Sequence, residues 1–268
     1  MLKKFIISFW LILFFVVSNG YTDENITLLT RAHSHNDYIR RRPLFEALEN
    51  GFCSVEADIY WVNGDLLVAH DLDKCKPERN LRDMYLKPIF ECVRRNNGHV
   101  YQTSSEFWFL IDIKNEPEKA YALLREQLEP YKSSLTRIEN GKKINGAVTV
   151  VISGAVPREA ITKDTNRYAF IDGRIDDLDK NLSPELVPWI SNSWFSIFSW
   201  NGKGEIPEQE RQKLREIVKR AHEEGKKVRF WDIPQTQDCW EVLYEEGVDF
   251  LHSDVPYRLS NFFKSKIK

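Results

Sequence analysis

The chain has 268 residues, and 42% of them are hydrophobic, with 8 tryptophans and 16 phenylalanines among them. This content allows a sizeable core and excludes an intrinsically disordered chain. The formal net charge is -2, so the basic excess of a nucleic-acid-binding protein is absent and we expect no nucleic-acid partner. The length fits one large domain, such as an α/β barrel of about 250 residues.

The first twenty residues have the pattern of a secretory signal peptide. Two lysines give a positive start, a largely apolar run follows from Phe5 to Val17, and Ser18-Asn19-Gly20 supplies small residues for cleavage. The run is shorter than the roughly 20 residues that span a bilayer, although a retained membrane anchor is the alternative. We therefore expect a signal peptide at 1–20 and a secreted or periplasmic domain at 21–268.

Four cysteines are present, namely Cys53, Cys75, Cys92 and Cys239. An exported protein can oxidise its cysteines, and the sequence cannot choose among the three full pairings that four cysteines allow. Cys53 lies in an apolar segment, which is typical of a small buried side chain, whereas Cys75 lies in a polar loop and could pair with Cys92. No C-x-x-C spacing occurs, which argues against a cysteine-based zinc site.

Segments with the patterns of strands and helices alternate along the rest of the chain. Apolar or alternating runs predict strands at 26–33, 52–61, 66–70, 107–114, 147–153, 168–174, 194–200, 227–233 and 250–255. Helical spacing, often with proline near the start or glycine after the end, predicts helices at 43–50, 84–96, 117–131, 157–163, 207–224 and 238–246.

This alternation favours a parallel sheet with helices outside it, which is an α/β fold. With about eight main strands, the natural outcome is a (βα)8 TIM barrel that forms a single domain, and an open doubly wound sheet is the alternative. No GxGxxG or GxxxxGK[ST] motif follows the first predicted strand, which argues against the common nucleotide-binding folds.

Carboxylates gather where the predicted strands end, and that is where function collects in such a barrel. Glu56 and Asp58 are two residues apart on one strand, so both side chains face the interior. Asp112 ends the next strand and adds a third carboxylate. Inward carboxylates repel one another unless a cation or a proton lies between them, and oxygen ligands favour Mg²⁺ or Ca²⁺ over zinc. Ordinary salt bridges to lysine or arginine are the alternative.

Two histidines stand at neighbouring positions of the predicted barrel. His33 ends the first strand, and His70 ends the hairpin that returns from the second. Imidazoles titrate near neutrality, so this pair suits acid–base chemistry beside a metal ion. His35 has the same strand parity as His33 and could also face the site. His99 and His222 are expected to be structural.

Together these residues resemble a known superfamily. Segments similar to those of the glycerophosphodiester phosphodiesterases are Ala32-His33, Glu56-Ala57-Asp58, the turn Asn63-Gly64-Asp65, residues 67–71 and residues 247–256. Those enzymes share a barrel with phosphatidylinositol-specific phospholipases C and spider sphingomyelinase D-type phospholipases. Asp112-Ile113-Lys114 is similar to the sphingomyelinase D pattern of a metal-binding aspartate followed by a substrate-facing lysine.

Two further segments resemble a branch that includes the fungal altered-inheritance-of-mitochondria proteins and exported bacterial relatives. They are residues 33–38, which read His-Ser-His-Asn-Asp-Tyr, and Phe230-Trp231-Asp232. The sequence also departs from the glycerophosphodiesterases. His33-Ser34-His35 stands where they have His-Arg-Gly, and Arg41-Arg42-Pro43-Leu44 lies in the region of their Glu-Asn-Thr, which often supplies a further metal ligand.

The resemblance covers residues 30–258 and implies metal-dependent cleavage of a small-molecule or lipid phosphodiester. One divalent cation, Mg²⁺ or Ca²⁺, would lie on Glu56, Asp58 and Asp112. One of His33 and His70 would take a proton from a neighbouring substrate hydroxyl, and the other would protonate the leaving oxygen, with a cyclic phosphodiester as the first product. Substrate contacts are assigned to His35, Asn36, Lys114, Arg174 and Trp231. Core packing is the alternative for Trp231, and metal ligation is the alternative for Asn36.

Two other functional classes remain open at this point. A secreted glycosidase would use paired carboxylates, but it would leave His33, His70 and Lys114 without a role. A non-catalytic binding protein on the same barrel is supported by the missing Glu-Asn-Thr and opposed by the two histidines and three carboxylates. A lipid substrate would bring peripheral membrane contact. The sequence does not indicate an oligomeric state.

Overall fold

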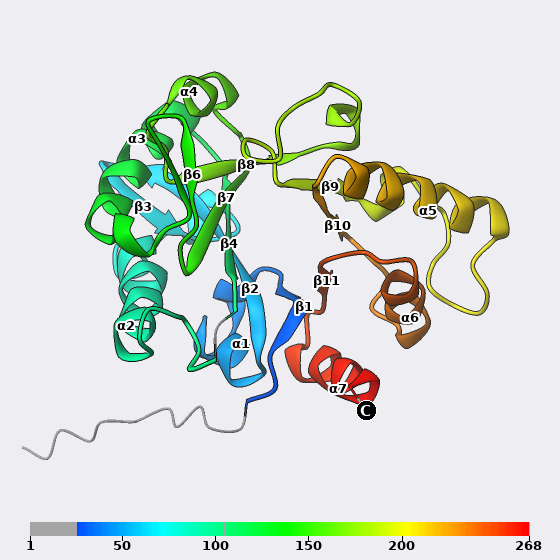
Figure 1. Ribbon diagram of the computed structural model, residues 1–268. Helices are drawn as coiled ribbons and strands as arrows, with labels where there is room; N and C mark the ends of the chain where they lie inside the picture. The colour runs from blue at the N-terminus through cyan, green and yellow to red at the C-terminus, as the bar shows by residue number, and fades with distance from the viewer. Residues whose placement is uncertain (1–25, 104, 268) are drawn as a thin grey trace, which may run out of the picture.

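The computed structural model describes residues 26–103 and 105–267, so the predicted signal peptide lies outside the described residues. Eight parallel strands form a ring, in the order β10-β9-β8-β7-β4-β2-β1-β11 (Figure 1). They are β1 (Leu29–Ser34), β2 (Phe52–Val62), β4 (Phe107–Ile113), β7 (Val148–Gly154), β8 (Ala169–Gly173), β9 (Trp189–Ser193), β10 (Lys227–Trp231) and β11 (Leu251–His252). A parallel bridge between Arg229 and Phe250 brings the ends of the ring together. The predicted TIM barrel is confirmed.

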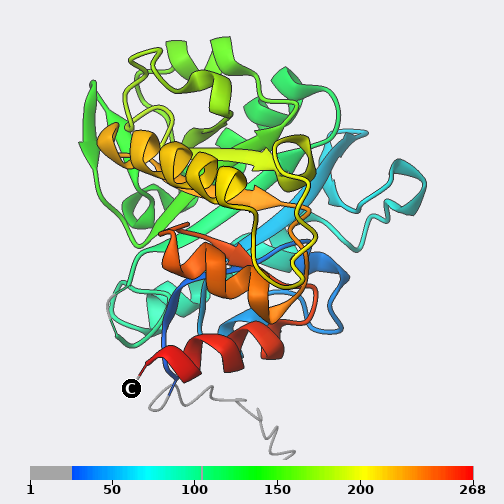
Figure 2. The same ribbon diagram turned by 90° about the vertical axis from the view of Figure 1, so that its right-hand side faces the viewer.

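Helices cover the outside of the ring, and Figure 2 shows three of them, α5, α6 and α7, side by side over the strands. The helices are α1 (Phe45–Glu49), α2 (Lys87–Arg95), α3 (Pro117–Leu128), α4 (Arg158–Lys163), α5 (Glu208–Glu223), α6 (Gln237–Glu245) and α7 (Pro256–Lys266). Strand β3 (Asp65–Val68) folds back on β2, and β5 (Arg137–Glu139) pairs with β6 (Lys142–Ile144). Within these described residues, no helix is both long enough and apolar enough to cross a bilayer.

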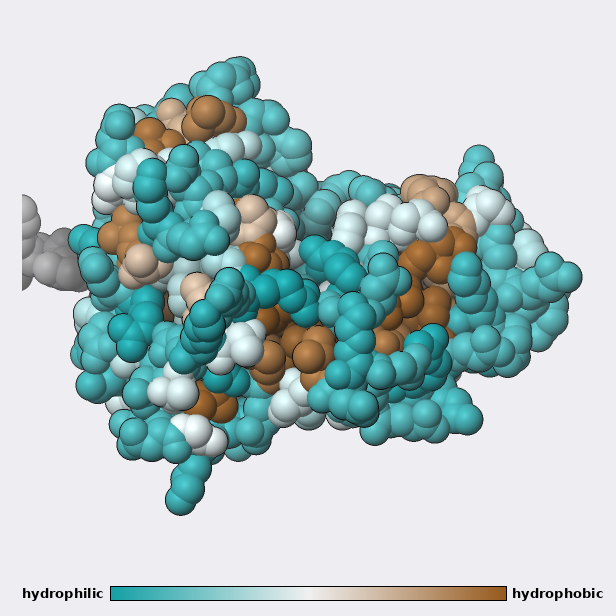
Figure 3. Space-filling view, turned by 90° about the horizontal axis from the view of Figure 1, so that it is seen from above, coloured by the Kyte–Doolittle hydropathy of each residue, from teal (hydrophilic) through white to brown (hydrophobic). Residues whose placement is uncertain are grey.

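The apolar residues form two buried clusters. The larger one lies between helices and strands, and a smaller one gathers Trp108, Leu110, Val151, Trp189 and Phe250. These five belong to β4, β7, β9 and the segment entering β11, so they fill the interior of the ring as barrel side chains do. Polar side chains cover most of the face in Figure 3, with smaller apolar areas between them.

One predicted strand is wrong. Residues 194–200 alternate as a strand would, but they form the short 3-10 helix η6 (Trp194–Ser196) and a loop. The Trp194 Nε1 donates a hydrogen bond to the Trp200 carbonyl at 2.9 Å, and Trp194 packs on Phe198 at 4.2 Å between ring centres. The strand is β9 instead, whose polar residues Ser191-Asn192-Ser193 hide it from a hydrophobicity pattern. Helix α7 was not predicted.

None of the four cysteines lines the polar pocket that is described below. Cys53 and Cys239 are buried, and burial raises the pKa of the Cys239 thiol to about 12. The small buried role expected for Cys53 is confirmed. Cys75 keeps a free thiol that contacts the backbone oxygen of Asp71, so the suggested pairing with Cys92 is wrong.

Candidate functional site

A polar pocket of about 290 Å³ opens where the parallel strands end. Nine of the ten predicted site residues line it, and His33 is the exception. Its lining consists of His35, Asn36, Glu56, Asp58, His70, Asp112, Lys114, Ser153, Arg174, Arg229, Trp231 and Asp232. Residues that are separated by up to 197 positions in the sequence therefore meet, because parallel strands bring their carboxyl ends to one face.

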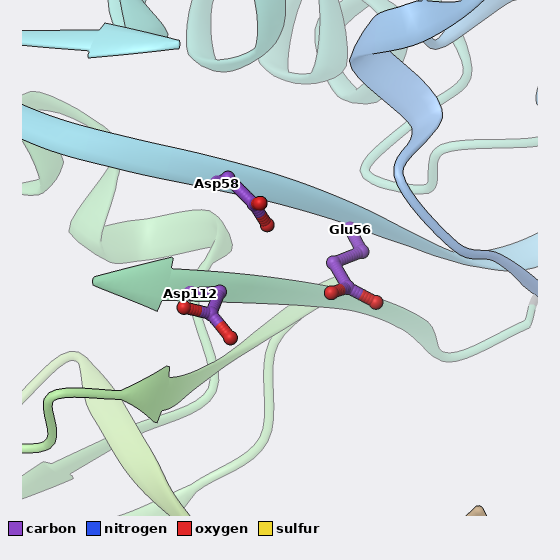
Figure 4. A group of neighbouring side chains, drawn as sticks. All are labelled: Glu56, Asp58 and Asp112. Carbon is purple, nitrogen blue, oxygen red and sulfur yellow. The ribbon is translucent and has the colours of Figure 1, made fainter. Parts of the chain in front are cut away.

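The three predicted carboxylates converge in this pocket. Glu56 and Asp58 project from the same face of β2, and Asp112 projects toward them from β4 (Figure 4). Asp58 and Asp112 are register partners. One oxygen from each of the three lies within 4.8 Å of the other two. The Asp58 Oδ1 is buried without a hydrogen-bond partner, and a buried carboxylate oxygen of this kind fits the role of a cation ligand.

Cationic or hydrogen-bonding side chains contact some of the other oxygens. The Glu56 Oε2 accepts from His33 Nε2 at 2.9 Å and from the buried Arg229 guanidinium. Lys114 Nζ lies 3.0 Å from both Asp58 Oδ2 and Asp112 Oδ1. Three carboxylates thus face two cations, so the site keeps negative charge for a hard divalent ion, which prefers such oxygen ligands.

The pKa values of the carboxylates differ with their neighbours. Burial and the charge of Glu56 raise the pKa of Asp58 to about 6, against the opposing effect of Lys114. Burial would also raise the pKa of Glu56, but the Arg229 guanidinium and the nearby histidines outweigh it and hold that pKa well below its ordinary range. A bound cation would favour the ionised form of Asp58.

His33 does not have the surroundings of a proton carrier that reaches substrate. Its side chain is fully buried, with Nδ1 2.7 Å from Ser54 Oγ and Nε2 2.9 Å from Glu56 Oε2. Burial, with the adjacent Arg229, lowers its pKa to about 3. The predicted role of His33 as an acid or base beside the metal therefore finds no support in its contacts, because the register that pairs His33 with Ser54 puts it one level below Glu56.

His35 and His70 are the histidines that reach the pocket. His35 follows β1, and its Nδ1 lies 3.8 Å from the Asp254 Oδ1 while its ring packs 4.7 Å from that of His252. Contact with His35 lowers the pKa of Asp254, so this carboxylate is ionised at neutral pH. His70 follows β3, with its Nδ1 3.1 Å from Asp71 Oδ1 and its side chain 63% exposed.

A buried aspartate holds the loop that carries His35. Asp37 accepts hydrogen bonds from Ser34 Oγ at 2.7 Å, Tyr85 Oη at 2.8 Å and the Leu44 amide. Asn36, which lines the pocket, has φ of 48°, in the left-handed region that asparagine tolerates better than most residues. These hydrogen bonds to Asp37 fix the backbone conformation of the segment between β1 and α1.

Two cations, Lys114 and Arg174, line the pocket with the carboxylate cluster. Lys114 bridges Asp58 and Asp112, as described above, and Arg174 directly follows β8. The Arg174 Nη1 donates to the buried Asp172 Oδ2 at 2.9 Å, and its guanidinium lies 5.0 Å from the centre of the Trp231 ring. These contacts fix Arg174 in place, so the pocket offers oriented positive charge to an anion.

Four residues of the site were missed from the sequence. Ser153, Arg229 and Asp232 line the pocket, and the Tyr38 hydroxyl donates to Asp58 Oδ2 at 2.8 Å. Arg229 shares strand parity with Trp231, which was a usable signal. Tyr38 belongs to the residues 33–38 that carried the resemblance, but its contact crosses from one loop to another strand. Asp232 belongs to the segment Phe230-Trp231-Asp232 that carried the resemblance but was assigned no role, and no local pattern indicated Ser153.

Comparison with known proteins identifies a family and similar proteins. The model of the family described as "AIM6-like phosphodiesterase domain" matches residues 23–172. An altered inheritance of mitochondria protein 6 homolog from Arthroderma benhamiae is 29% identical over 252 residues, covering 83% of this chain and 80% of the relative. The altered inheritance of mitochondria protein 6 of Eremothecium gossypii is 30% identical over 275 residues, covering 89% and 71%.

Solved structures show the same fold. A glycerophosphodiester phosphodiesterase from Parabacteroides distasonis has a TM-score of 0.57 at 16% identity, covering 89% of this chain and 98% of that one. One from Agrobacterium tumefaciens has a TM-score of 0.50 at 15% identity, covering 88% and 100%. At these identities the likeness concerns the barrel alone. The family match spans more than half of the chain, and the chain therefore belongs to the AIM6-like phosphodiesterase domain family.

Proposed function

We propose that this protein is a metal-dependent phosphoric diester hydrolase. The observation that carries the proposal is the convergence of Glu56, Asp58 and Asp112 beside Lys114, in a pocket that His35 and His70 also line. A glycosidase would need only two carboxylates and would leave the lysine and both histidines unexplained. The phosphodiesterase description of the matching family supports the reaction class.

The residues fit one divalent cation, Mg²⁺ or Ca²⁺, held by Glu56, Asp58 and Asp112. The unpartnered Asp58 Oδ1 and the all-oxygen donor set support this assignment. When bound, the ion offsets the negative charge that develops on the phosphate oxygens. Lys114 and Arg174 bind the phosphate, since both line the pocket and are held there by neighbouring carboxylates.

The acid and the base are assigned to His35 and His70 in place of His33 and His70. His35 takes the proton of the attacking hydroxyl, because the ionised Asp254 beside its Nδ1 stabilises the imidazolium that forms. His70 gives a proton to the leaving oxygen as its bond to phosphorus breaks. Where the attacking hydroxyl belongs to the substrate, the product is a cyclic phosphodiester.

Metal dependence and the two histidine roles are tested on a panel of phosphodiesters, with products identified by phosphorus NMR. EDTA should abolish turnover, and Mg²⁺ or Ca²⁺ should restore it. His35→Ala and His70→Ala should each lower kcat by about 10²–10⁴. A substrate with a good leaving group should rescue His70→Ala and leave His35→Ala slow, because only the general acid becomes dispensable.

His99→Ala serves as the matched control, since His99 lies outside the pocket and should leave kcat unchanged. Full turnover of a metal-free preparation removes the one-metal hypothesis. Wild-type turnover in both His35→Ala and His70→Ala contradicts the assigned chemistry and favours a binding protein on the same barrel.

A further inference from the structure

The exposed apolar side chains of this protein are unevenly distributed. Across residues 26–103 and 105–267, five large hydrophobic side chains are exposed by between 55% and 60%, namely Ile39, Leu72, Phe195, Tyr257 and Ile267. Ile39, Leu72 and Phe195 lie in the short segments that follow β1, β3 and β9, and Tyr257 lies in the first turn of α7, shortly after β11. Ile267 lies at the far end of α7, beside the C-terminus (Figure 2).

Short stretches of chain tie these four side chains to the site. Ile39 lies three residues after Asn36, and Leu72 lies two after His70, both of which line the pocket. An extended chain spans at most about 3.6 Å per residue. The backbones of Ile39 and Leu72 are therefore within about 11 Å of a pocket residue.

Phe195 and Tyr257 lie close in sequence to residues that contact the pocket lining. Phe195 lies two residues after Ser193, whose Oγ donates to Asp232 at 3.1 Å. Tyr257 lies three residues after Asp254, the partner of His35. All four residues thus lie within three positions of a pocket residue or of a residue that contacts one.

The four side chains also follow strands that are neighbours around the barrel. The strands β9, β10, β11, β1 and β2, with β3 on β2, are consecutive neighbours around the barrel. The exposed apolar side chains follow strands of this half, and none of the five follows β4, β7 or β8. We call Ile39, Leu72, Phe195 and Tyr257 the apolar rim.

Basic residues adjoin the apolar rim. Arg41 and Arg258 are exposed near Ile39 and Tyr257, whereas Arg40 donates to the carbonyls of His35, Ser253 and Asp254 and Arg42 pairs with Glu49. Aromatic and aliphatic side chains beside arginine suit the boundary between lipid headgroups and acyl chains, where the apolar part is buried and the cation meets phosphate. The pocket itself is polar and holds about 290 Å³, which is room for a headgroup and its phosphate rather than for acyl chains.

We propose that the apolar rim seats the mouth of the pocket on a phospholipid bilayer, so that a lipid phosphodiester enters headgroup first while its acyl chains stay in the membrane. This inference rests on the proposed function for the nature of the substrate. The surface contact itself needs no turnover, so binding and hydrolysis can be measured separately.

The test is sedimentation of the full chain with phosphatidylcholine vesicles, and with vesicles that also contain phosphatidylglycerol. Leu72→Ser and Phe195→Ser should each lower partitioning onto vesicles by about tenfold, because each removes one side chain that inserts, and the double variant should remove binding. Ile267→Ser is the matched control, equally exposed but far from the pocket, and should bind as the wild type does. Hydrolysis of a water-soluble phosphodiester should be the same in all four variants.

The two ideas fail in different ways. A wild type that hydrolyses soluble phosphodiesters and does not sediment with either vesicle overturns the membrane contact and leaves the proposed function intact. Vesicle binding that depends on the apolar rim, in a protein without hydrolytic activity, keeps the contact and removes the function. If light scattering shows dimers that Leu72→Ser and Phe195→Ser dissociate, without vesicle binding, the apolar rim is an interface between copies of the chain and the bilayer is excluded.

Discussion

His33 and His35 stand two residues apart on one face of the chain and have opposite surroundings. His33 is enclosed with both ring nitrogens hydrogen bonded, while His35 reaches the pocket. The pKa of His33, lowered to about 3 by burial and by Arg229, keeps its ring neutral at physiological pH. A neutral ring with Ser54 and Glu56 as partners orients Glu56, and we propose that His33 is a positioning residue for a cation bound there.

Substitution of His33 separates positioning from catalysis. His33→Ala should weaken binding of Mg²⁺ or Ca²⁺ by about 10–100-fold, since residues that orient a metal ligand typically carry effects of this size. His33→Gln should lose much less, because its amide can still contact Ser54 and Glu56. Calorimetric titration measures both affinities, and circular dichroism confirms folding.

The opposite pattern would return His33 to a catalytic role. In that case both variants would bind the cation as the wild type does and would still lose turnover at saturating metal. The comparison with His35→Ala is informative here, because that substitution should change kcat and leave metal affinity nearly unchanged.

Pairs of helices outside the barrel are held by charges as well as by apolar packing. Glu246, which directly follows α6, accepts from Arg215 Nε at 2.7 Å and from Arg211, both on α5. Its side chain is only 8% exposed. Burial would raise the pKa of Glu246, but hydrogen bonds from the two arginines outweigh burial and lower it. The ionised carboxylate therefore stabilises the contact between α5 and α6.

Because the pKa of Glu246 is lowered in the folded protein, its contribution to stability depends on pH. A carboxyl whose pKa is lower in the folded state contributes stability above its unfolded pKa and loses it as pH falls through the folded value. Glu246→Gln should lower the free energy of unfolding by about 1–3 kcal/mol at pH 7, and the loss should shrink below about pH 4. Urea unfolding at both pH values measures it.

Glu208→Gln is the control for this pair. Glu208 lies 3.5 Å from Arg215, but its side chain is 78% exposed, and exposed pairs contribute little. Its unfolding free energy should match that of the wild type. A loss in Glu246→Gln that is equal at both pH values would mean that packing, and not charge, is responsible.

For the whole molecule, the untested expectation is export. The two lysines, the apolar run from Phe5 to Val17 and the small residues after it predict cleavage. N-terminal sequencing of exported protein should begin near Gly20 to Asp23, and Phe14→Arg, which interrupts the apolar run, should retain the protein inside the cell. Intact Met1 on membrane-bound protein would support an anchor instead.

The sequence determined the class of fold and most of the residues that line the pocket. Alternating strand and helix patterns of this length leave few arrangements, and parity along β2 is a local property that put Glu56 and Asp58 on one face. The strand ends also indicated Asp112, Lys114 and Arg174, because in a barrel these ends share one face. Such inferences need only the period of a strand and the direction of its neighbours.

Only the tertiary structure decided how deep each side chain lies. Parity puts His33 and His35 on the same face, but the register of β1 against β2 sets His33 level with Ser54 and leaves His35 beyond the strand. Tyr38 and Arg229 meet Asp58 and Glu56 across distances in sequence that no local pattern encodes. The apolar segment 194–200 packs around Trp194 because β9 already occupies the ring. Register and packing are long-range properties, and they determine which histidine faces the pocket.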